Sequence, residues 1–248
     1  VLPIAALVIF LFAFTYKNRN SDREFEKAIR SMTVVVDAGH GGTDKGVVTK
    51  DGKYNEAALS LAIAKKIQHL APDYNINVIL TRENENFPGG ATNRNDALRK
   101  RVEITNLINP AAFISIHMSG TSETEQKIKS GFESYITKTT NNGPDLTLAS
   151  AIRKELRDIY KVSGAVKYRE DKGIFVLDRS NTPSVLLECG YLNNPEDVSF
   201  FSSDDNLEKV AKAILGGLVK FTNNQIKKLN GSFEIPYDQD GIEVGREL

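Results

Sequence analysis

The chain has 248 residues, enough for one α/β domain, and its 32 basic and 32 acidic side chains balance, so nothing in its charge favours nucleic acid as a partner. The single cysteine, Cys189, excludes an internal disulfide and a thiolate metal cluster. A metal site would therefore use histidine and carboxylate ligands, and only His40, His69 and His117 are available.

The first sixteen residues carry no charge and are almost wholly apolar, and Lys17 and Arg19 follow them. As a helix they would span about 24 Å, less than the roughly 30 Å hydrocarbon core of a membrane. No clear small-x-small cleavage site precedes Tyr16, so we expect residues 1–16 to be an uncleaved signal anchor. A cleaved signal peptide and a buried helix are the alternatives. Residues 17–31 would be a tether, and the following domain would lie outside the cytoplasmic membrane, in the cell envelope.

The next segments predict strands that alternate with helices. Thr33–Asp37 is a short apolar strand that ends in a glycine-rich turn around His40. Asn55 suits the N-cap of a helix through Leu70, which places Glu56 in its first turn. Further strands are predicted at 76–81, 111–117, 131–137, 174–177 and 184–187, and further helices at 96–108, 144–160 and 207–221. The segment 162–171 stays unassigned, and polar residues predict a loose tail over 230–248.

This alternation indicates one α/β domain over residues 32–229, with a mostly parallel sheet covered by helices on both faces. Three of the predicted strands deliver a chemically capable residue at their ends, namely His40, His117 and Glu188. The carboxyl ends of parallel strands share one edge, and the helix that begins at Glu56 starts near that edge. Four residues far apart in the sequence are therefore expected at one crevice.

Two imidazoles and a carboxylate form a three-ligand Zn²⁺ set that leaves a fourth position for water. We assign His40, Glu56 and His117 as the ligands. Glu188 is assigned as the acid/base that takes the proton of the water and passes it to a leaving nitrogen. Asp37 is a candidate to orient a ligand. Each histidine taken alone would more often be structural, and Glu56 alone would be a solvated carboxylate, so the assignment depends on their convergence.

Other roles for the neighbouring residues stay open. Gly41 and Gly42 let the backbone approach a bound group closely, so they are candidate substrate contacts. Tyr191 either lines the site or packs in the core. The glycine loop could instead hold a phosphate, although it lacks the spacings of the known phosphate-binding loops. Cys189 could act as a nucleophile with His40 or His117 as its base.

With these residues named, the chain resembles the zinc-dependent N-acetylmuramoyl-L-alanine amidases of bacterial cell walls, from about Thr33 to Phe221. The resemblance implies a twisted, roughly six-stranded sheet and the ligand and catalytic roles assigned above. It also implies hydrolysis of the amide between the lactyl group of N-acetylmuramic acid and the L-alanine of the stem peptide. The motifs that carry it are Val34–Gly46, Asn55–Ala62, Leu80–Arg82 with Arg94 and Arg101, Phe113–His117, and Val185–Asn194.

We therefore predict a zinc amidase that acts on peptidoglycan, in cell-wall remodelling or daughter-cell separation. It would be tethered to the membrane through residues 1–16 if these are not cleaved. Two alternatives remain at this point: a zinc peptidase that trims stem peptides, and a wall-binding module of the same fold without turnover. Peptidoglycan is the expected partner, a protein activator is left open, and nucleic acid is not expected.

Overall fold

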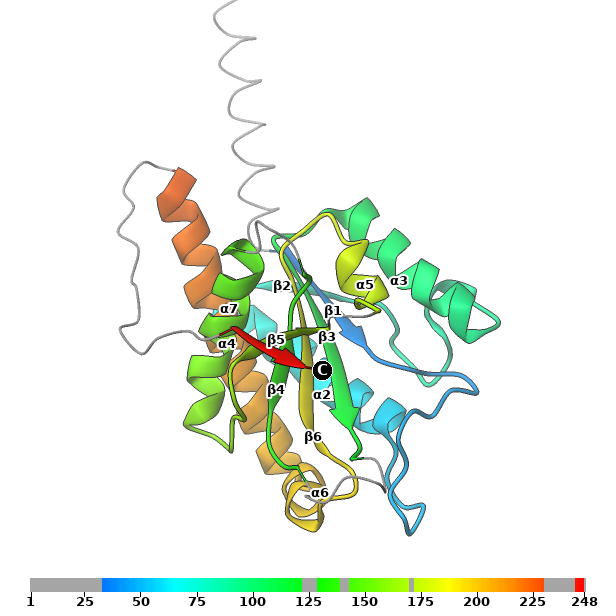
Figure 1. Ribbon diagram of the computed structural model, residues 1–248. Helices are drawn as coiled ribbons and strands as arrows, with labels where there is room; N and C mark the ends of the chain where they lie inside the picture. The colour runs from blue at the N-terminus through cyan, green and yellow to red at the C-terminus, as the bar shows by residue number, and fades with distance from the viewer. Residues whose placement is uncertain (1–32, 122–128, 139–142, 170–171, 230–243, 248) are drawn as a thin grey trace, which may run out of the picture.

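The computed structural model describes residues 33–121, 129–138, 143–169, 172–229 and 244–247. They form an α/β fold around a seven-stranded sheet with the strand order β2-β1-β3-β6-β4-β5-β7 (Figure 1). The segments predicted as an anchor, 1–16, and as a tether, 17–31, lie outside these ranges. Every helix within the described ranges is too short or too polar to cross a membrane.

The sheet is mostly parallel, as the sequence predicts. Among the strand pairs of the described residues, β4–β6 alone is antiparallel, so β4, β5 and β7 run opposite to the other four strands. The central strands β1, β3 and β6 are parallel neighbours, which brings their carboxyl ends to one edge. The strands are β1 (Thr33–Ala38), β2 (Asn77–Leu80), β3 (Ala112–Ser119), β4 (Glu133–Tyr135), β5 (Val166–Arg169), β6 (Ser184–Tyr191) and β7 (Val244–Glu247).

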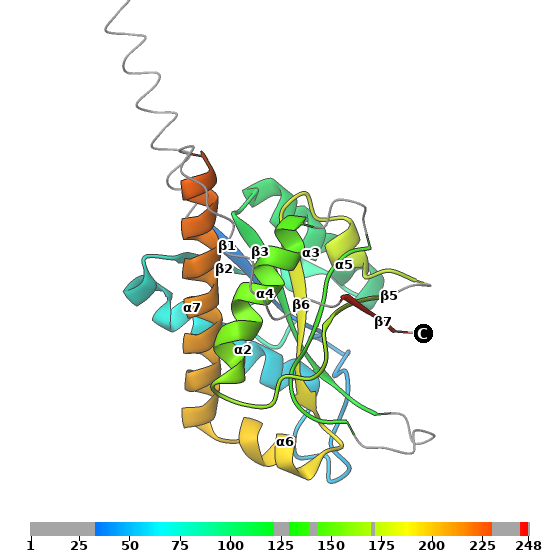
Figure 2. The same ribbon diagram turned by 60° about the vertical axis from the view of Figure 1, so that its left-hand side comes forward.

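Helices cover both faces of the sheet (Figures 1 and 2). Helices α2, α4 and α7 pack on one face, and α3 and α5 pack on the other. Helix α6 lies between β6 and α7 along the chain. The helices are α2 (Glu56–Leu70), α3 (Arg94–Ile108), α4 (Gly143–Arg157), α5 (Phe175–Asp178), α6 (Pro195–Phe201) and α7 (Asp204–Leu229), with 3₁₀ turns at Ala71–Tyr74 and Pro88–Gly90.

The alternation of side chains along the strands divides the core into two parts. Val34 and Val36 face the larger apolar cluster beneath α2, α4 and α7. Val35, Phe113 and Leu186 face the smaller cluster beneath α3 and α5. Towards the carboxyl ends of the strands, the α3 side of the sheet changes from apolar to polar residues, and the candidate site begins there.

One predicted strand is wrong. The segment 174–177 forms the start of helix α5, in which the Asp178 carboxylate accepts a hydrogen bond from the backbone N–H of Ile174 at 2.8 Å. A run of four apolar residues is too short for periodicity to distinguish a strand from a helix. By contrast, the helix from Asn55 is confirmed, because the Asn55 side chain accepts a hydrogen bond from the N–H of Ala58 at 3.0 Å.

Several boundaries also differ. Strand β6 continues past Leu187 to Tyr191, so Glu188 lies inside a strand rather than after it. Strand β3 continues to Ser119, so His117 lies inside this strand rather than at its last residue. The unassigned segment contains β5. Strand β7, Val244–Glu247, pairs in parallel with β5 in a region predicted as a loose tail, and the rest of that region lies outside the described residues.

Candidate metal centre

The loop after β1 holds His40 in a left-handed backbone conformation that residues other than glycine rarely adopt. His40 has a φ of 60°, and Gly41 follows with a φ of 118°. Two buried arginines fix the backbone of this loop. Arg82 donates from Nε to the carbonyl of Ala38 at 2.9 Å, and Arg101 donates from Nη2 to the carbonyl of His40 at 2.5 Å. The left-handed turn is therefore held by hydrogen bonds, which directs the imidazole towards the sheet edge.

Asp37 anchors one of these arginines. Its fully buried carboxylate accepts hydrogen bonds from Arg101 Nε at 2.7 Å, from Thr81 at 2.5 Å and from Ser115 at 2.7 Å. Burial acts to raise the pKa of Asp37, but Arg101 and the two hydroxyls outweigh it and hold this pKa below its usual value. Asp37 therefore acts on His40 through Arg101 and the loop backbone, rather than through a hydrogen bond to a ligand imidazole.

Glu56 enters the site from the first turn of α2. Its Oε2 accepts a hydrogen bond from the N–H of Val47 at 3.0 Å, and its Oε1 accepts one from the N–H of Met118 at 3.1 Å. The loop must come close here, because a Cβ on Gly46 would collide with the Glu56 carboxylate. Burial acts to raise the pKa of Glu56, but His117 and His40 outweigh it and leave this pKa well below its usual value. The carboxylate is thus ionised, as a metal ligand requires.

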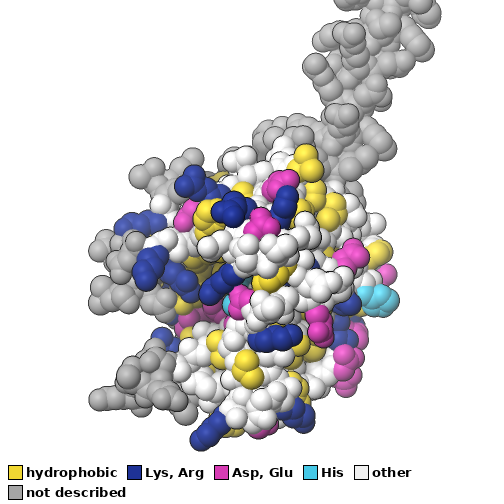
Figure 3. Space-filling view, turned by 90° about the vertical axis from the view of Figure 1, so that its right-hand side faces the viewer, with side chains coloured by type: hydrophobic (Ala, Val, Ile, Leu, Met, Phe, Trp, Pro, Cys, Tyr) yellow, Lys and Arg dark blue, Asp and Glu magenta, His cyan; other side chains and the backbone are white. Residues whose placement is uncertain are grey.

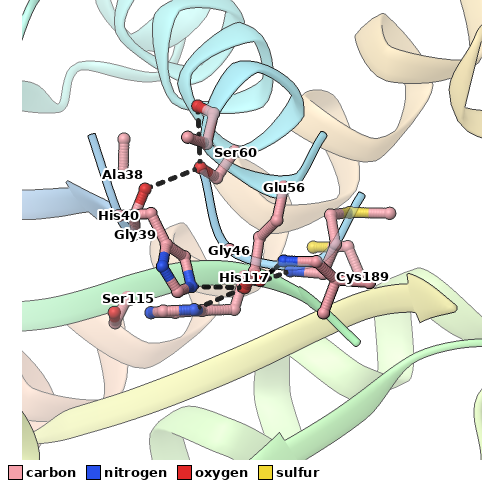
Figure 4. A network of polar contacts seen from close by, with 12 residues as sticks. Ala38, Gly39, His40, Gly46, Glu56, Ser60, Ser115, His117 and Cys189 are labelled. Carbon is pink, nitrogen blue, oxygen red and sulfur yellow. Dashed lines mark hydrogen bonds and ion pairs between the residues drawn. The ribbon is translucent and has the colours of Figure 1, made fainter. Parts of the chain in front are cut away.

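The three predicted ligands meet at one point, as Figure 4 shows. Glu56 Oε1 lies 3.0 Å from His40 Nε2 and 2.7 Å from His117 Nδ1. The two imidazole rings cross edge to face with their centroids 5.0 Å apart. One ligand atom from each residue lies within 4.8 Å of the others, so this trio could hold a metal ion. Two nitrogen donors and one ionised oxygen donor fit a catalytic metal with an open position.

Glu188 stands beside this trio. It is the parallel register partner of His117 on the adjacent strand, so both side chains leave the same face of the sheet. The side chain is 8% exposed, and its Oε2 has no hydrogen-bond partner among the described residues. Burial raises the pKa of Glu188 to about 7, although its neighbours His117 and Arg169 act against this rise. A carboxyl with this pKa can both accept and donate a proton near neutral pH.

Comparisons with known proteins agree with this geometry. Residues 34–220 match the family model described as N-acetylmuramoyl-L-alanine amidase. The chain belongs to the N-acetylmuramoyl-L-alanine amidase family. It is 27% identical to the germination-specific N-acetylmuramoyl-L-alanine amidase of Bacillus subtilis, and the match covers 87% of this chain and 90% of that protein. Escherichia coli AmiA, an N-acetylmuramoyl-L-alanine amidase, is 25% identical to this chain. That match covers 82% of this chain and 81% of AmiA.

Solved structures of amidases share the fold. The CwlD amidase of Clostridioides difficile, in complex with the GerS lipoprotein, has a TM-score of 0.66 and 31% identity, covering 77% of this chain and 98% of that one. The N-acetylmuramoyl-L-alanine amidase AmiC2 of Nostoc punctiforme has a TM-score of 0.64 and 28% identity, with 78% and 98% covered. The predicted fold class and enzyme class, an amidase acting on peptidoglycan, are thereby confirmed.

Two other candidate residues of the amidase, Tyr191 and Cys189, are buried. Tyr191 is 3% exposed, and its N–H donates to Asp197 at 2.8 Å, which favours the packing role over a place in the site. The Cys189 thiol is fully buried, and burial raises its pKa, so it is not an activated nucleophile. Gly41 and Gly42 pack against the backbone and ring of residues 86 and 87, and their contact with substrate stays a prediction.

Sequence reasoning missed two supporting groups. Ser115 is a polar residue inside the apolar β3 run, and this interruption is a signal that the pattern contains. Glu133 on β4 is the antiparallel register partner of Glu188, and its position depends on a pairing that the sequence does not reveal.

The Asp37–Arg101 pair is expected to dominate the stability of the His40 loop. An Arg101→Met substitution leaves a fully buried carboxylate without its cation, so we expect the free energy of unfolding to fall by about 3–5 kcal/mol. Urea denaturation would measure the loss. Lys100→Met is the matched control, because Lys100 forms only a surface ion pair with Glu103 and should change stability by less than about 1 kcal/mol. Equal stability of the two variants would contradict this role.

The raised pKa of Glu188 predicts a pH dependence of stability in protein kept metal-free by a chelator. The folded pKa of about 7 lies above the ordinary value of 4.5, so the unfolded chain releases this proton first and stability falls as pH rises through that window. A Glu188→Gln variant lacks this titration. As the pH rises from 4.5 to about 7, its free energy of unfolding should therefore increase by about 3 kcal/mol relative to that of the unsubstituted protein. Denaturation at a series of pH values tests this, and a constant difference would refute it.

Proposed function

We propose that this amidase is zinc-dependent and that His40, Glu56 and His117 hold the ion. The observation that carries the proposal is the convergence of these three donors beside Glu188. Mixed imidazole and carboxylate ligands are typical of catalytic zinc, whereas magnesium and calcium sites are built from oxygen donors. A zinc ion held there would polarise the substrate carbonyl and lower the pKa of a water to about 7.

Glu188 is proposed to move the proton. Its carboxylate accepts a proton from the attacking water and then donates this proton to the nitrogen of the scissile amide. The amide that breaks joins the lactyl group of N-acetylmuramic acid to the L-alanine of the stem peptide. The buried position of Glu188 makes its carboxylate more basic, and its free Oε2 is available to the reacting groups. Arg82 and Arg101 hold the His40 loop, which keeps the ligand in position.

We further propose a setting for this reaction. The enzyme would act in the cell envelope, outside the cytoplasmic membrane, in wall remodelling or daughter-cell separation. Residues 1–16 would anchor it to the membrane. A protein partner is also proposed, because the CwlD amidase with the same fold is found in complex with the GerS lipoprotein.

Release of intact stem peptides from purified cell-wall sacculi tests the proposed reaction. The purified protein should release peptides that begin with L-alanine, a chelator should stop the release, and added zinc should restore it. A digest of defined muropeptides separates the amidase from a peptidase, because only the amidase frees the whole stem from the sugar. Full activity in a metal-free preparation, or cleavage only within the peptide, would contradict the proposal.

A further inference from the structure

A carboxylate outside the ligand cluster lies next to the His40 ring. Nε2 of His40 lies 3.0 Å from Glu56 Oε1, and Nδ1 of the same ring lies 3.0 Å from Asp44 Oδ2. Asp44 is not one of the three residues that converge at the candidate metal centre. The two nitrogens of an imidazole point in different directions, so one nitrogen of His40 faces the ligand cluster while the other faces Asp44.

The Nδ1 atom of His40 needs an acceptor. It is buried, and it makes no regular hydrogen bond among the described residues. A buried donor that is left without an acceptor costs free energy, because water no longer satisfies it. The fold brings Asp44 Oδ2 to 3.0 Å from this nitrogen, which is already the separation of a hydrogen bond. Only the direction of the ring N–H has to change for Asp44 to accept it.

The loop itself fixes the Asp44 carboxylate. Asp44 and Gly41 exchange two backbone hydrogen bonds, at 2.9 and 3.0 Å, which close the loop without any side chain. The second carboxylate oxygen, Oδ1, accepts a hydrogen bond from the N–H of Gly46 at 3.1 Å. Gly46 is the residue that packs against the Glu56 carboxylate. Asp44 therefore contacts one predicted ligand directly and holds the backbone that packs on a second.

The contact between Asp44 and His40 is largely shielded from solvent. The side chain of Asp44 is 19% exposed and that of His40 is 13% exposed. Arg94 Nε lies 3.5 Å from the same Asp44 oxygen, but the Arg94 side chain is 72% exposed, so solvent screens this ion pair. The imidazole is thus the better protected partner of Asp44. Figure 3 shows a recessed histidine with acidic and basic side chains beside it on one face of the molecule.

Metal binding sets a requirement on the His40 ring. A histidine binds a metal through an unprotonated nitrogen, so a His40 that binds through Nε2 carries its proton on Nδ1. A carboxylate that accepts a hydrogen bond from Nδ1–H selects this tautomer, fixes the plane of the ring and makes Nε2 a stronger donor. Asp37, the candidate that the sequence indicates for this role, acts through Arg101 instead.

We propose that Asp44 is the positioning residue of His40: its carboxylate accepts a hydrogen bond from Nδ1–H and so presents Nε2 to the zinc ion. The inference rests on the proposed function for the identity of the ion. Partners of this kind contribute about 10- to 100-fold to metal affinity. Because Asp44 lies outside the ligand cluster, its loss should weaken zinc binding without abolishing the site.

The first test is the zinc affinity of Asp44→Asn. The amide keeps the shape of the side chain, but it has no charge and only one oxygen, so it cannot accept hydrogen bonds from both His40 and Gly46. We expect the dissociation constant for zinc, measured by competition with a chromogenic chelator, to rise about 10- to 100-fold. Urea denaturation of the metal-free variant should show a folded protein, because the backbone hydrogen bonds between Gly41 and Asp44 remain.

Asp51→Asn is the matched control. Asp51 is an exposed carboxylate of the following turn, and it accepts a hydrogen bond from the Thr49 hydroxyl at 2.6 Å. The substitution makes the same chemical change in the same part of the chain, at a residue outside the ligand cluster. It should leave the dissociation constant for zinc unchanged.

The second test is a long-range ¹H–¹⁵N NMR spectrum of the imidazoles in the zinc-loaded protein, which separates positioning from a merely structural role. His40 should show a zinc-bound Nε2 and an Nδ1 proton that is protected from exchange. In Asp44→Asn at saturating zinc, this proton should move upfield and exchange faster. The signals of His117 should stay the same, because its Nδ1 faces Glu56 rather than Asp44.

Equal zinc affinity in Asp44→Asn and Asp51→Asn would overturn the inference, and so would an unchanged Nδ1 proton of His40. The spectrum of the unsubstituted protein decides the matter even if the variant does not fold, since a zinc-bound His40 without a protected Nδ1 proton contradicts the proposal. Zinc binding that is insensitive to Asp44 would overturn this inference alone. If the unsubstituted protein bound no zinc, the proposed function itself would fail.

Discussion

Replacing Glu188 with glutamine is expected to lower kcat on a defined muropeptide by about 10²- to 10⁴-fold, the range that a positioned acid/base contributes. Glutamine keeps the shape of the side chain but cannot accept and return a proton. Because Glu188 is not one of the three residues that converge as ligands, the variant should still bind one equivalent of zinc. Activity assays together with the measured metal content test both parts.

The control for this prediction is Glu103→Gln. Glu103 is an exposed carboxylate on α3 that pairs only with Lys100 at the surface, so its loss should leave kcat unchanged. A Glu188→Gln enzyme that kept activity within a few-fold of the unsubstituted protein would show that another group moves the proton. Loss of zinc from this variant would instead assign Glu188 to the ligand set.

Replacing His117 with alanine should weaken zinc binding by at least about 100-fold, since even partners outside the ligand set cost 10- to 100-fold. The change removes one of the two imidazoles and also the 2.7 Å contact of Nδ1 with Glu56 Oε1. Activity should disappear with the metal and return in part at high zinc concentration. Competition with a chromogenic chelator measures the affinity directly.

His69→Ala is the matched control, because His69 is exposed in the last turn of α2 and lies outside the ligand cluster. It should leave both zinc affinity and activity unchanged. If the His117 and His69 variants bound zinc equally well, the ligand assignment would fail. If the His117 variant lost activity but kept full zinc affinity, His117 would act on the substrate instead.

The site could be predicted from the sequence because the parallel arrangement of the strands places the site residues. Short apolar runs predict buried strands, and parallel strands bring their carboxyl ends to one edge whatever the details of their boundaries. His40, His117 and Glu188 therefore converge although the sequence places the ends of β3 and β6 too early. Glu56 follows from the N-cap at Asn55, which is a strong local signal.

The features that the sequence did not predict depend on pairing between distant segments. Strand β4 is antiparallel to β6, and this pairing alone places Glu133 opposite Glu188. The same pairing leads on to β5 and so places Arg169 over Tyr135. Helix α5 was missed because its four residues give no usable periodicity. Local pattern indicates which elements form, and register decides which side chains become neighbours.

Anomalous X-ray scattering at the zinc edge, measured on crystals of the zinc-loaded protein, tests the central claim most directly. We expect one strong peak about 2.0–2.2 Å from a nitrogen of His40, a nitrogen of His117 and an oxygen of Glu56, with Glu188 outside bonding distance. A zinc-loaded crystal with no peak at these three residues, or with its peak on other side chains, would contradict the account.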